Sequence, residues 1–224
     1  MGRSFVLSLL GVSVGAVLLA AQGEAGLQSG PKEGKLLPGP LECYLFNARH
    51  LKSKEKQAFH CLVCQYALNP AVLVFVRDRE PNKEKDAVID ALMKRLEEAV
   101  PDYKRFELRA GVVFLSPDAQ SSATNPKEED PDKLLDEAKK RDAVFARLSE
   151  RAASFKELDV AVFPGQSPKG YNINPKAEVT ILFLWKLKVV SNQAFAPGTM
   201  TEADIDKLFA KINDTLEPAK KKKG

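Results

Sequence analysis

The sequence predicts an α/β domain built on a mixed β-sheet. Short apolar runs rich in β-branched residues alternate along the chain with longer segments whose apolar residues recur at helical spacing. A strand, a helix and a second strand in succession place the two strands parallel, with the helix packed on the sheet. Near the carboxyl terminus, two strand-like runs follow each other across a short turn, which predicts an antiparallel hairpin. We therefore expect a central mixed sheet of about five strands, with helices on both faces.

Most of the expected strands are apolar enough to lie inside a folded domain. The run AVLVFV at residues 71–76 has no polar residue, so both of its faces should be buried, as in the interior of an α/β sheet. The single tryptophan, Trp185, lies in another such run and is expected in the core. Further strands are expected at residues 43–46, 108–115, 158–163, 179–185 and 189–195.

Three helices are expected between and after these strands. In the first, apolar residues recur every three or four positions from Val88 to Ala99, and Pro101 should end the helix. The last should begin at Thr201, because Thr201-x-x-Asp204 resembles a capping box in which Asp replaces the usual Glu or Gln. For the second helix, the expected apolar face consists of Leu134, Leu135, Ala138, Phe145, Leu148 and Ala152.

The order of these elements is similar to that of the thioredoxin-like fold, in the longer variety with an inserted strand that peroxiredoxins have. The similarity extends over residues 70–214 and depends on the element order and on the ending VTILFLWKLKVVSNQAF…TEADIDKLFAKI. In that ending a strand, a short turn, a second strand and a capped helix follow one another as they do in thioredoxins. The resemblance implies a thioredoxin-like sandwich and a role in thiol–disulfide chemistry.

The amino-terminal residues 1–25 have the pattern of a secretory signal peptide. Arg3 supplies a positive charge, no charged residue occurs from Phe5 to Ala21, and small residues at Gly23 and Ala25 favour cleavage after Ala25. The alternative is an uncleaved membrane anchor, for which the apolar run is at the short limit of a spanning helix. We expect a cleaved signal and an exported protein, in the periplasm or cell envelope or secreted, in an oxidising environment.

Composition divides the rest of the chain into a linker, one domain and a tail. Residues 26–40 are rich in Gly, Pro and Lys and predict a flexible linker. The domain is expected at residues 41–216, beginning with a cysteine-containing extension at 41–69. Residues 217–224 should form a disordered basic tail, whose Lys220–Lys223 run is the only expected membrane contact besides the signal peptide. The net charge is only +4 and no basic patch is interleaved with aromatic residues, so nucleic-acid binding is not expected.

All three cysteines and both histidines of the chain lie between residues 43 and 64, and Cys61 and Cys64 form a Cys-x-x-Cys pair. In thioredoxin-like enzymes such a pair follows the first central strand and opens the next helix, whose amino terminus stabilises a thiolate. Here the pair precedes the strand at 71–76 instead. Residues 77–100 contain no cysteine, which also argues against a peroxidatic cysteine of the peroxiredoxin type.

A second feature of the family, a cis-proline just before the penultimate strand, is also missing from its expected position. Val179 occupies that position, and a cis peptide bond before a non-proline residue costs about 3 kcal/mol. The Cys-x-x-Cys pair is therefore expected at the edge of the sheet opposite to the family's active site.

Three interpretations of the cysteines remain open. Cys61 and Cys64 are candidate catalytic residues of an exchangeable dithiol, with protein thiols or disulfides as partners and no cofactor. Alternatively, two of Cys43, Cys61 and Cys64 form a structural disulfide that holds the amino-terminal segment to the domain. In the third interpretation, Cys43, His50, Cys61 and Cys64 hold zinc or copper, because these metals prefer thiolate and imidazole ligands. We expect redox-related work through Cys61 and Cys64; the alternative function is a non-catalytic structural or binding module of the same fold.

Overall fold

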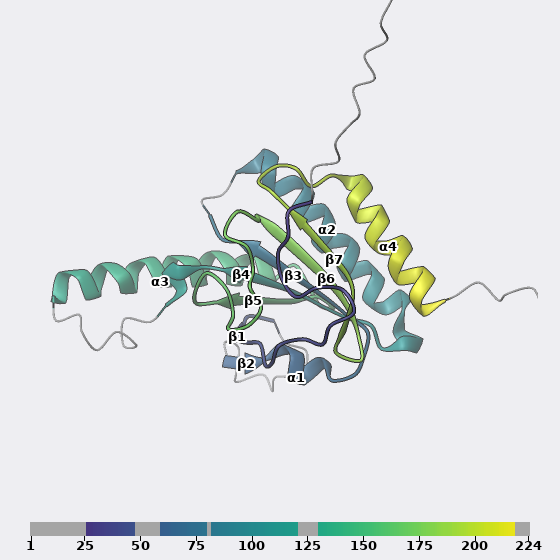
Figure 1. Ribbon diagram of the computed structural model, residues 1–224. Helices are drawn as coiled ribbons and strands as arrows, with labels where there is room; N and C mark the ends of the chain where they lie inside the picture. Colours follow the sequence, from purple (N-terminus) through teal and green to yellow (C-terminus); the bar gives the residue numbers. More distant parts are fainter. Residues whose placement is uncertain (1–25, 48–58, 80–81, 121–129, 218–224) are drawn as a thin grey trace, which may run out of the picture.

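The computed structural model describes residues 26–47, 59–79, 82–120 and 130–217, which contain one mixed β-sheet (Figure 1). The strand order across this sheet is β2-β1-β5-β4-β3-β6-β7. In the described residues the strands are β1 Glu42–Leu45, β2 Phe59–Cys61, β3 Ala71–Arg77, β4 Arg109–Leu115, β5 Asp159–Phe163, β6 Val179–Trp185 and β7 Lys188–Phe195. The α-helices are α1 Leu62–Tyr66, α2 Lys83–Asp102, α3 Pro131–Ala152 and α4 Glu202–Leu216, and the 3-10 helices are η1 Lys104–Phe106 and η2 Pro117–Ala119.

The sheet contains the expected mixed core, the short strand expected at residues 43–46, and one strand that was not expected. β3 lies at the centre, parallel to β4 and antiparallel to β6, while β5 is parallel to β4 and β7 is antiparallel to β6. The expected number of about five strands is too low: the strand predicted at residues 43–46 is present as β1, antiparallel to β5, and the unexpected β2 pairs antiparallel with β1. β2 has only three residues, too few to give a recognisable alternating pattern.

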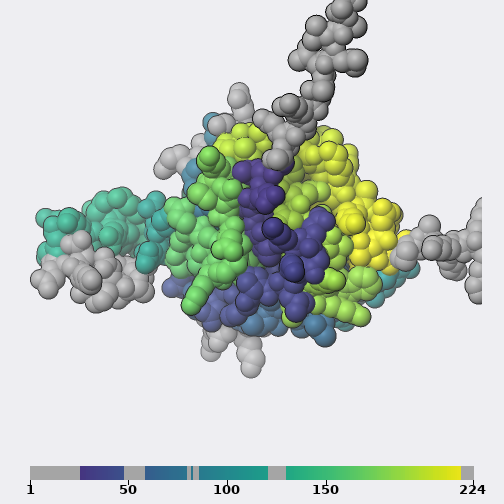
Figure 2. Space-filling model, viewed as in Figure 1, coloured from purple at the N-terminus to yellow at the C-terminus, as the bar shows by residue number. Residues whose placement is uncertain are grey.

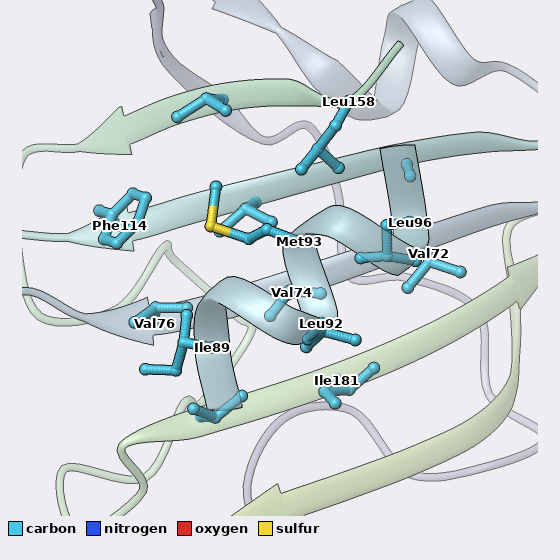
Figure 3. Packing of buried hydrophobic residues seen from close by; sticks show 14 of the residues in the cluster. Val72, Val74, Val76, Ile89, Leu92, Met93, Leu96, Phe114, Leu158 and Ile181 are labelled. Atoms are coloured by element: carbon cyan, nitrogen blue, oxygen red, sulfur yellow. The ribbon is translucent and has the colours of Figure 1, made fainter. Parts of the chain in front are cut away.

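Side chains of β3 alternate between two apolar clusters, one on each face of the sheet. Val72, Val74 and Val76 belong to the larger cluster. Figure 3 shows Val76 beside Ile89 of α2, and Val72 beside Leu96. The intervening residues of the strand belong to the smaller cluster on the other face. Both faces of β3 are therefore buried, as its unbroken apolar run predicts.

Helices cover both faces of the sheet, but unequally. α2, α3 and α4 all contribute to the larger cluster. The crossovers β3-α2-β4 and β4-α3-β5 step across the sheet in the same direction, so right-handed connections place both helices on the same face. The other face is covered by the five-residue α1, by Leu41 of the amino-terminal segment, and by Tyr171 and Ile173 of the loop before β6.

Residues 26–40 lie against the domain and do not form the flexible linker that their composition predicts. Ser29 is buried, and its hydroxyl oxygen lies 2.6 Å from Thr180 Oγ1 of β6. Farther along, the Gly34 N–H donates to the carbonyl oxygen of Val189 in β7 at 2.8 Å. Figure 2 shows the segment in purple, crossing the front of the molecule between its green and yellow parts. The Gly and Pro residues here belong to the turns of a docked segment.

Two residues expected in the core are exposed. Trp185, at the end of β6, is 39% exposed, and Leu135 in α3 is 56% exposed. The buried face of α3 consists of Val144, Leu148 and Ala152, all in its second half. The first half of α3 extends beyond the sheet, so its apolar residues have no strand beneath them (Figure 1).

The capping box expected at the start of α4 is present. Thr201 caps the helix, and its backbone N–H donates to Asp204 Oδ2 at 3.1 Å. The shorter Asp side chain thus performs the reciprocal bond usually made by Glu or Gln.

No helix in the described part of the chain is long and apolar enough to cross a bilayer. The predicted signal peptide, residues 1–25, lies outside the described residues, as does all of the predicted basic tail except Glu217. Both remain predictions.

Candidate functional site

Cys61 and Cys64 form a disulfide where β2 meets α1. Cys61 is the last residue of β2, where it pairs with Glu42 of β1, and it is also the N-cap of α1. Its sulfur accepts a hydrogen bond from the Cys64 backbone N–H at 3.2 Å. Cys64 is exposed, whereas Cys61 is half-buried. One sulfur of the bridge therefore belongs to a solvent-facing residue, and the other belongs to a residue held in the sheet.

Buried contacts fix α1 on the sheet. Leu62, Val63 and Tyr66 are buried in the smaller cluster, and the Tyr66 hydroxyl donates to Asp159 Oδ2 at 2.9 Å. Burial, and after it the negative charge of Asp159, raise the pKa of Tyr66 well above its ordinary value. The phenol consequently stays protonated and remains the donor of this bond.

The disulfide lies at the amino-terminal edge of the parallel strands, as its place in the sequence predicts. The chain leaves α1 and enters β3 at Ala71, which pairs with Leu184 of β6. Val179, to which the resemblance assigns the family's cis-proline, pairs with Val76 at the other end of β3. No peptide bond in the described residues is cis. The Cys-x-x-Cys pair does begin a helix of its own, but this helix lies a strand's length from Val179.

Cys43 is buried and is not part of the disulfide. It pairs with His60 in the β1–β2 ladder, and its thiol lies 3.8 Å from the His60 carbonyl oxygen and 3.9 Å from that of Leu41. Burial, followed by the charge of Asp159, raises the pKa of Cys43 from 9.0 to about 12. The structural-disulfide interpretation that includes Cys43 is not the pairing found here, because Cys61 and Cys64 are joined to each other.

The zinc or copper interpretation is not supported by the described residues. Among them, no group of three His, Cys, Asp or Glu side chains is arranged to hold a metal ion. His50, one of the four ligands in that interpretation, lies outside the described residues. Two of the other three, Cys61 and Cys64, form the disulfide.

The opposite, carboxyl-terminal edge of β3 and β4 has a cleft of about 280 Å³ lined by four arginines and three aspartates. In open α/β sheets this edge is where ligands bind. Here its charges are largely paired within the protein. Arg79 Nε lies 2.7 Å from Glu178 Oε1, and Arg79 Nη2 lies 3.2 Å from Asp86 Oδ1. Arg147 of α3 lies 2.5 Å from Asp78, whose side chain is 7% exposed.

Glu178 stands directly before β6, next to the position that the resemblance assigns to the cis-proline. It is buried, and besides the Arg79 pair its Oε2 accepts the Gly198 N–H at 2.9 Å. An ion pair therefore occupies the region where the family's site is expected, and no cysteine of the described residues lies there. Sequence reasoning missed this network, although the alternation Arg77-Asp78-Arg79 directly after a buried strand is a visible signal of it.

Asp159 and Tyr66 were also outside the sequence-based set of site residues. Asp159 is the only ionisable residue in the otherwise apolar run LDVAVF, and its burial at the start of β5 places a carboxylate under α1. That isolated charge inside a strand pattern is the signal that points to it, because a buried carboxylate needs hydrogen-bond donors.

Comparisons with solved structures give matches over most of the chain. An uncharacterized conserved protein from Geobacillus kaustophilus is 13% identical at a TM-score of 0.51, and the match covers 87% of this chain and 88% of that one. A protein from Chlorobium tepidum, provisionally named thiol:disulfide interchange protein DsbE, is 15% identical at 0.47, covering 85% and 99%. Reduced Prx3 from Vibrio vulnificus is 12% identical at 0.39, covering 80% and 99%.

The chain has the thioredoxin-like fold. Along the chain, β3, α2, β4, α3, β5, the antiparallel pair β6–β7 and the capped α4 follow one another in the order that the sequence resemblance implies. At these low identities the structural matches concern the fold alone. No family model matches the sequence, and no curated protein does. Function must therefore be argued from the site.

Proposed function

We propose that this protein is exported and takes part in thiol–disulfide exchange through Cys61 and Cys64, with thiols or disulfides of other proteins as its substrates. The observation that carries the proposal is the Cys61–Cys64 disulfide, whose second cysteine is exposed. A bridge between residues three positions apart closes only a small loop and restricts the unfolded chain little, so stabilisation is a weak reason for its presence. An exposed bridge is open to attack by an external thiolate.

Export is the second part of the proposal. The signal-peptide pattern of residues 1–25, with cleavage after Ala25, would deliver the protein to an oxidising compartment in the periplasm, cell envelope or medium. In such a compartment the disulfide is the resting form of the pair. The protein would then accept electrons from reduced partners or exchange bridges with oxidised ones.

The reduction potential of the pair tests whether it is exchangeable. The oxidised protein is equilibrated with mixtures of reduced and oxidised glutathione, quenched with acid and alkylated, and the free thiols are counted by mass. We expect a potential between about −270 and −120 mV, the range of thiol–disulfide oxidoreductases. A value below about −300 mV, typical of structural disulfides, contradicts the proposal.

Turnover provides the functional measurement. The protein should accelerate the reduction of insulin by dithiothreitol. This acceleration should be lost in both Cys61→Ser and Cys64→Ser. Cys43→Ser is the matched control and should keep the activity, because Cys43 is buried and outside the bridge. Equal rates in all variants would instead favour a non-catalytic binding module. One observation supports that second candidate: the Arg79–Glu178 ion pair, and no cysteine of the described residues, lies at the edge of the sheet where the fold's site is expected.

A further inference from the structure

The two sulfurs of the Cys61–Cys64 bridge are not equivalent. Cys64 is exposed on α1, while Cys61 is half-buried and continues the β1–β2 ladder, where it pairs with Glu42. The Leu62 N–H, next to Cys61, donates to the Leu41 carbonyl oxygen at 3.0 Å and holds this junction in place. Which sulfur of a disulfide is attacked depends on access and on the stability of the thiolate that leaves.

We infer that an incoming thiolate attacks the sulfur of Cys64 and that Cys61 is the leaving group. This assignment rests on the proposed function and specifies its chemistry. The substrate thiolate forms a bond to Cys64 Sγ, the Cys61–Cys64 bond breaks, and its electron pair stays on Cys61 as a thiolate. A second thiolate of the substrate then attacks the substrate sulfur and releases Cys64 as a thiolate. The substrate dithiol is thereby oxidised to a disulfide, and the protein disulfide is reduced to two thiols.

The hydrogen bond from the Cys64 N–H to Cys61 Sγ supports Cys61 as the leaving group. The N–H already points at Cys61 Sγ at 3.2 Å in the oxidised protein, so no rearrangement is needed to stabilise the charge that develops there. Hydrogen bonds to a charged acceptor are stronger than those to a neutral one, so this contact strengthens as the bond breaks. Attack at Cys61 would require entry beside the β1–β2 ladder and would leave the charge on exposed Cys64.

Cys43 does not compete as the resolving thiol. It is buried, lies on the neighbouring strand opposite His60, and stands outside the bridge. Its thiol faces the carbonyl oxygens of Leu41 and His60, which favour the protonated form. Exchange therefore stays within Cys61, Cys64 and the substrate.

The site of attack can be read directly by mass spectrometry. The oxidised full chain is mixed with excess reduced glutathione at pH 8, quenched with acid after short times, and alkylated with N-ethylmaleimide. Fragment spectra then show which cysteine carries glutathione. We expect glutathione on Cys64 and N-ethylmaleimide on Cys61, in roughly tenfold excess over the reverse at the earliest times, because access decides the attacked sulfur. Glutathione mainly on Cys61, equal amounts on both, or no adduct would overturn the assignment.

Variants that keep only one cysteine of the pair exclude migration of glutathione between the two sulfurs. In Cys61→Ser the remaining Cys64 should react with glutathione disulfide roughly tenfold faster than Cys61 does in Cys64→Ser, again because of access. Equal rates, or a faster Cys61, would contradict the assignment. The outcome is independent of the insulin assay: adducts on Cys64 without turnover leave the assignment intact and defeat the proposed function. Turnover with adducts on Cys61 supports the proposed function and overturns the assignment.

Discussion

The Tyr66 hydroxyl donates a hydrogen bond of 2.9 Å to Asp159 Oδ2, joining two residues 93 positions apart in the chain. Both side chains are buried. The bond ties α1 to the first residue of β5 and thereby fixes where the disulfide lies relative to the sheet. The position of the candidate site thus depends on a tertiary contact between a phenol and a carboxylate.

Removing this bond should destabilise the fold. Tyr66→Phe keeps the ring in the apolar cluster but deprives the buried Asp159 carboxylate of a donor, so the free energy of unfolding should fall by about 1 to 3 kcal/mol. Urea unfolding measures the change. Tyr44→Phe is the matched control, because no hydrogen bond of the Tyr44 hydroxyl occurs among the described residues; its effect should stay within about 0.5 kcal/mol. Equal effects of the two substitutions would argue against the Tyr66–Asp159 bond.

Gly111 should be intolerant of a side chain because Tyr66 lies against it. A Cβ at Gly111 would lie 2.4 Å from Tyr66 Oη, so Gly111→Ala should reduce the free energy of unfolding by about 1 to 3 kcal/mol through overpacking. In a Tyr66→Phe background the same substitution should be less damaging, since the clashing oxygen is gone. Gly26→Ala, which meets no atom within 4 Å, is the control. Strict additivity of the two substitutions would contradict the contact.

The Arg79–Glu178 pair should contribute to stability at the carboxyl-terminal edge. Arg79→Ala leaves the buried Glu178 carboxylate without its cation and should lower the free energy of unfolding by about 1 to 3 kcal/mol, a range reduced because Arg79 is partly exposed. Adding Glu178→Gln should recover part of the loss by removing the buried charge. Lys140→Ala, which breaks an exposed pair with Asp136, should leave the thermal midpoint unchanged. Failure of Glu178→Gln to recover any stability would exclude charge burial as the cause.

Alkaline pH should destabilise the protein partly through Cys43. Its pKa is 9.0 in the unfolded chain and about 12 when folded, so the folded state holds the proton more tightly. The stabilisation is complete below pH 9 and is lost as the pH rises toward 12, with a slope approaching about 1.4 kcal/mol per pH unit between these values. A Cys61→Ala/Cys64→Ala background prevents disulfide reshuffling. In that background, Cys43→Ala should reduce the dependence of the unfolding free energy on pH by the contribution of one proton, up to about 1.4 kcal/mol per pH unit. An unchanged slope in urea titrations from pH 8 to 11 would show that Cys43 does not titrate in this way.

The amino-terminal segment should resist proteolysis while Ser29 is in place. The Ser29 hydroxyl contacts Thr180 Oγ1 at 2.6 Å and accepts the Asn174 N–H at 2.9 Å. Ser29→Ala removes both bonds from a buried site and should weaken the docking of the segment on the domain by about 1 kcal/mol. Trypsin should therefore cut more readily after Lys32 and Lys35. Ser154→Ala, at an exposed position, should not change the cleavage rate. Rapid cleavage of the unaltered protein at these lysines would instead support the linker that composition predicts.

The strands and helices with strong patterns could be predicted from the sequence. The unbroken run at 71–76 and the Thr201-x-x-Asp204 box each occur where the pattern places them, as β3 and as the cap of α4. Apolar periodicity and capping are local properties, so they can be read without knowledge of the fold. β2 and the docking of residues 26–40 could not be predicted in this way, because each depends on a partner that is distant in the chain.

The sequence by itself determined that the Cys-x-x-Cys pair precedes the central strand, since chain order fixes which end of β3 the pair must approach. Only the tertiary structure decided that Cys61 is held in a ladder, that Cys64 faces solvent and that Cys43 is buried beside them. It also decided that ion pairs occupy the opposite edge. The physical reason is that burial and charge pairing arise between segments far apart in the chain, and no local pattern records which segments meet.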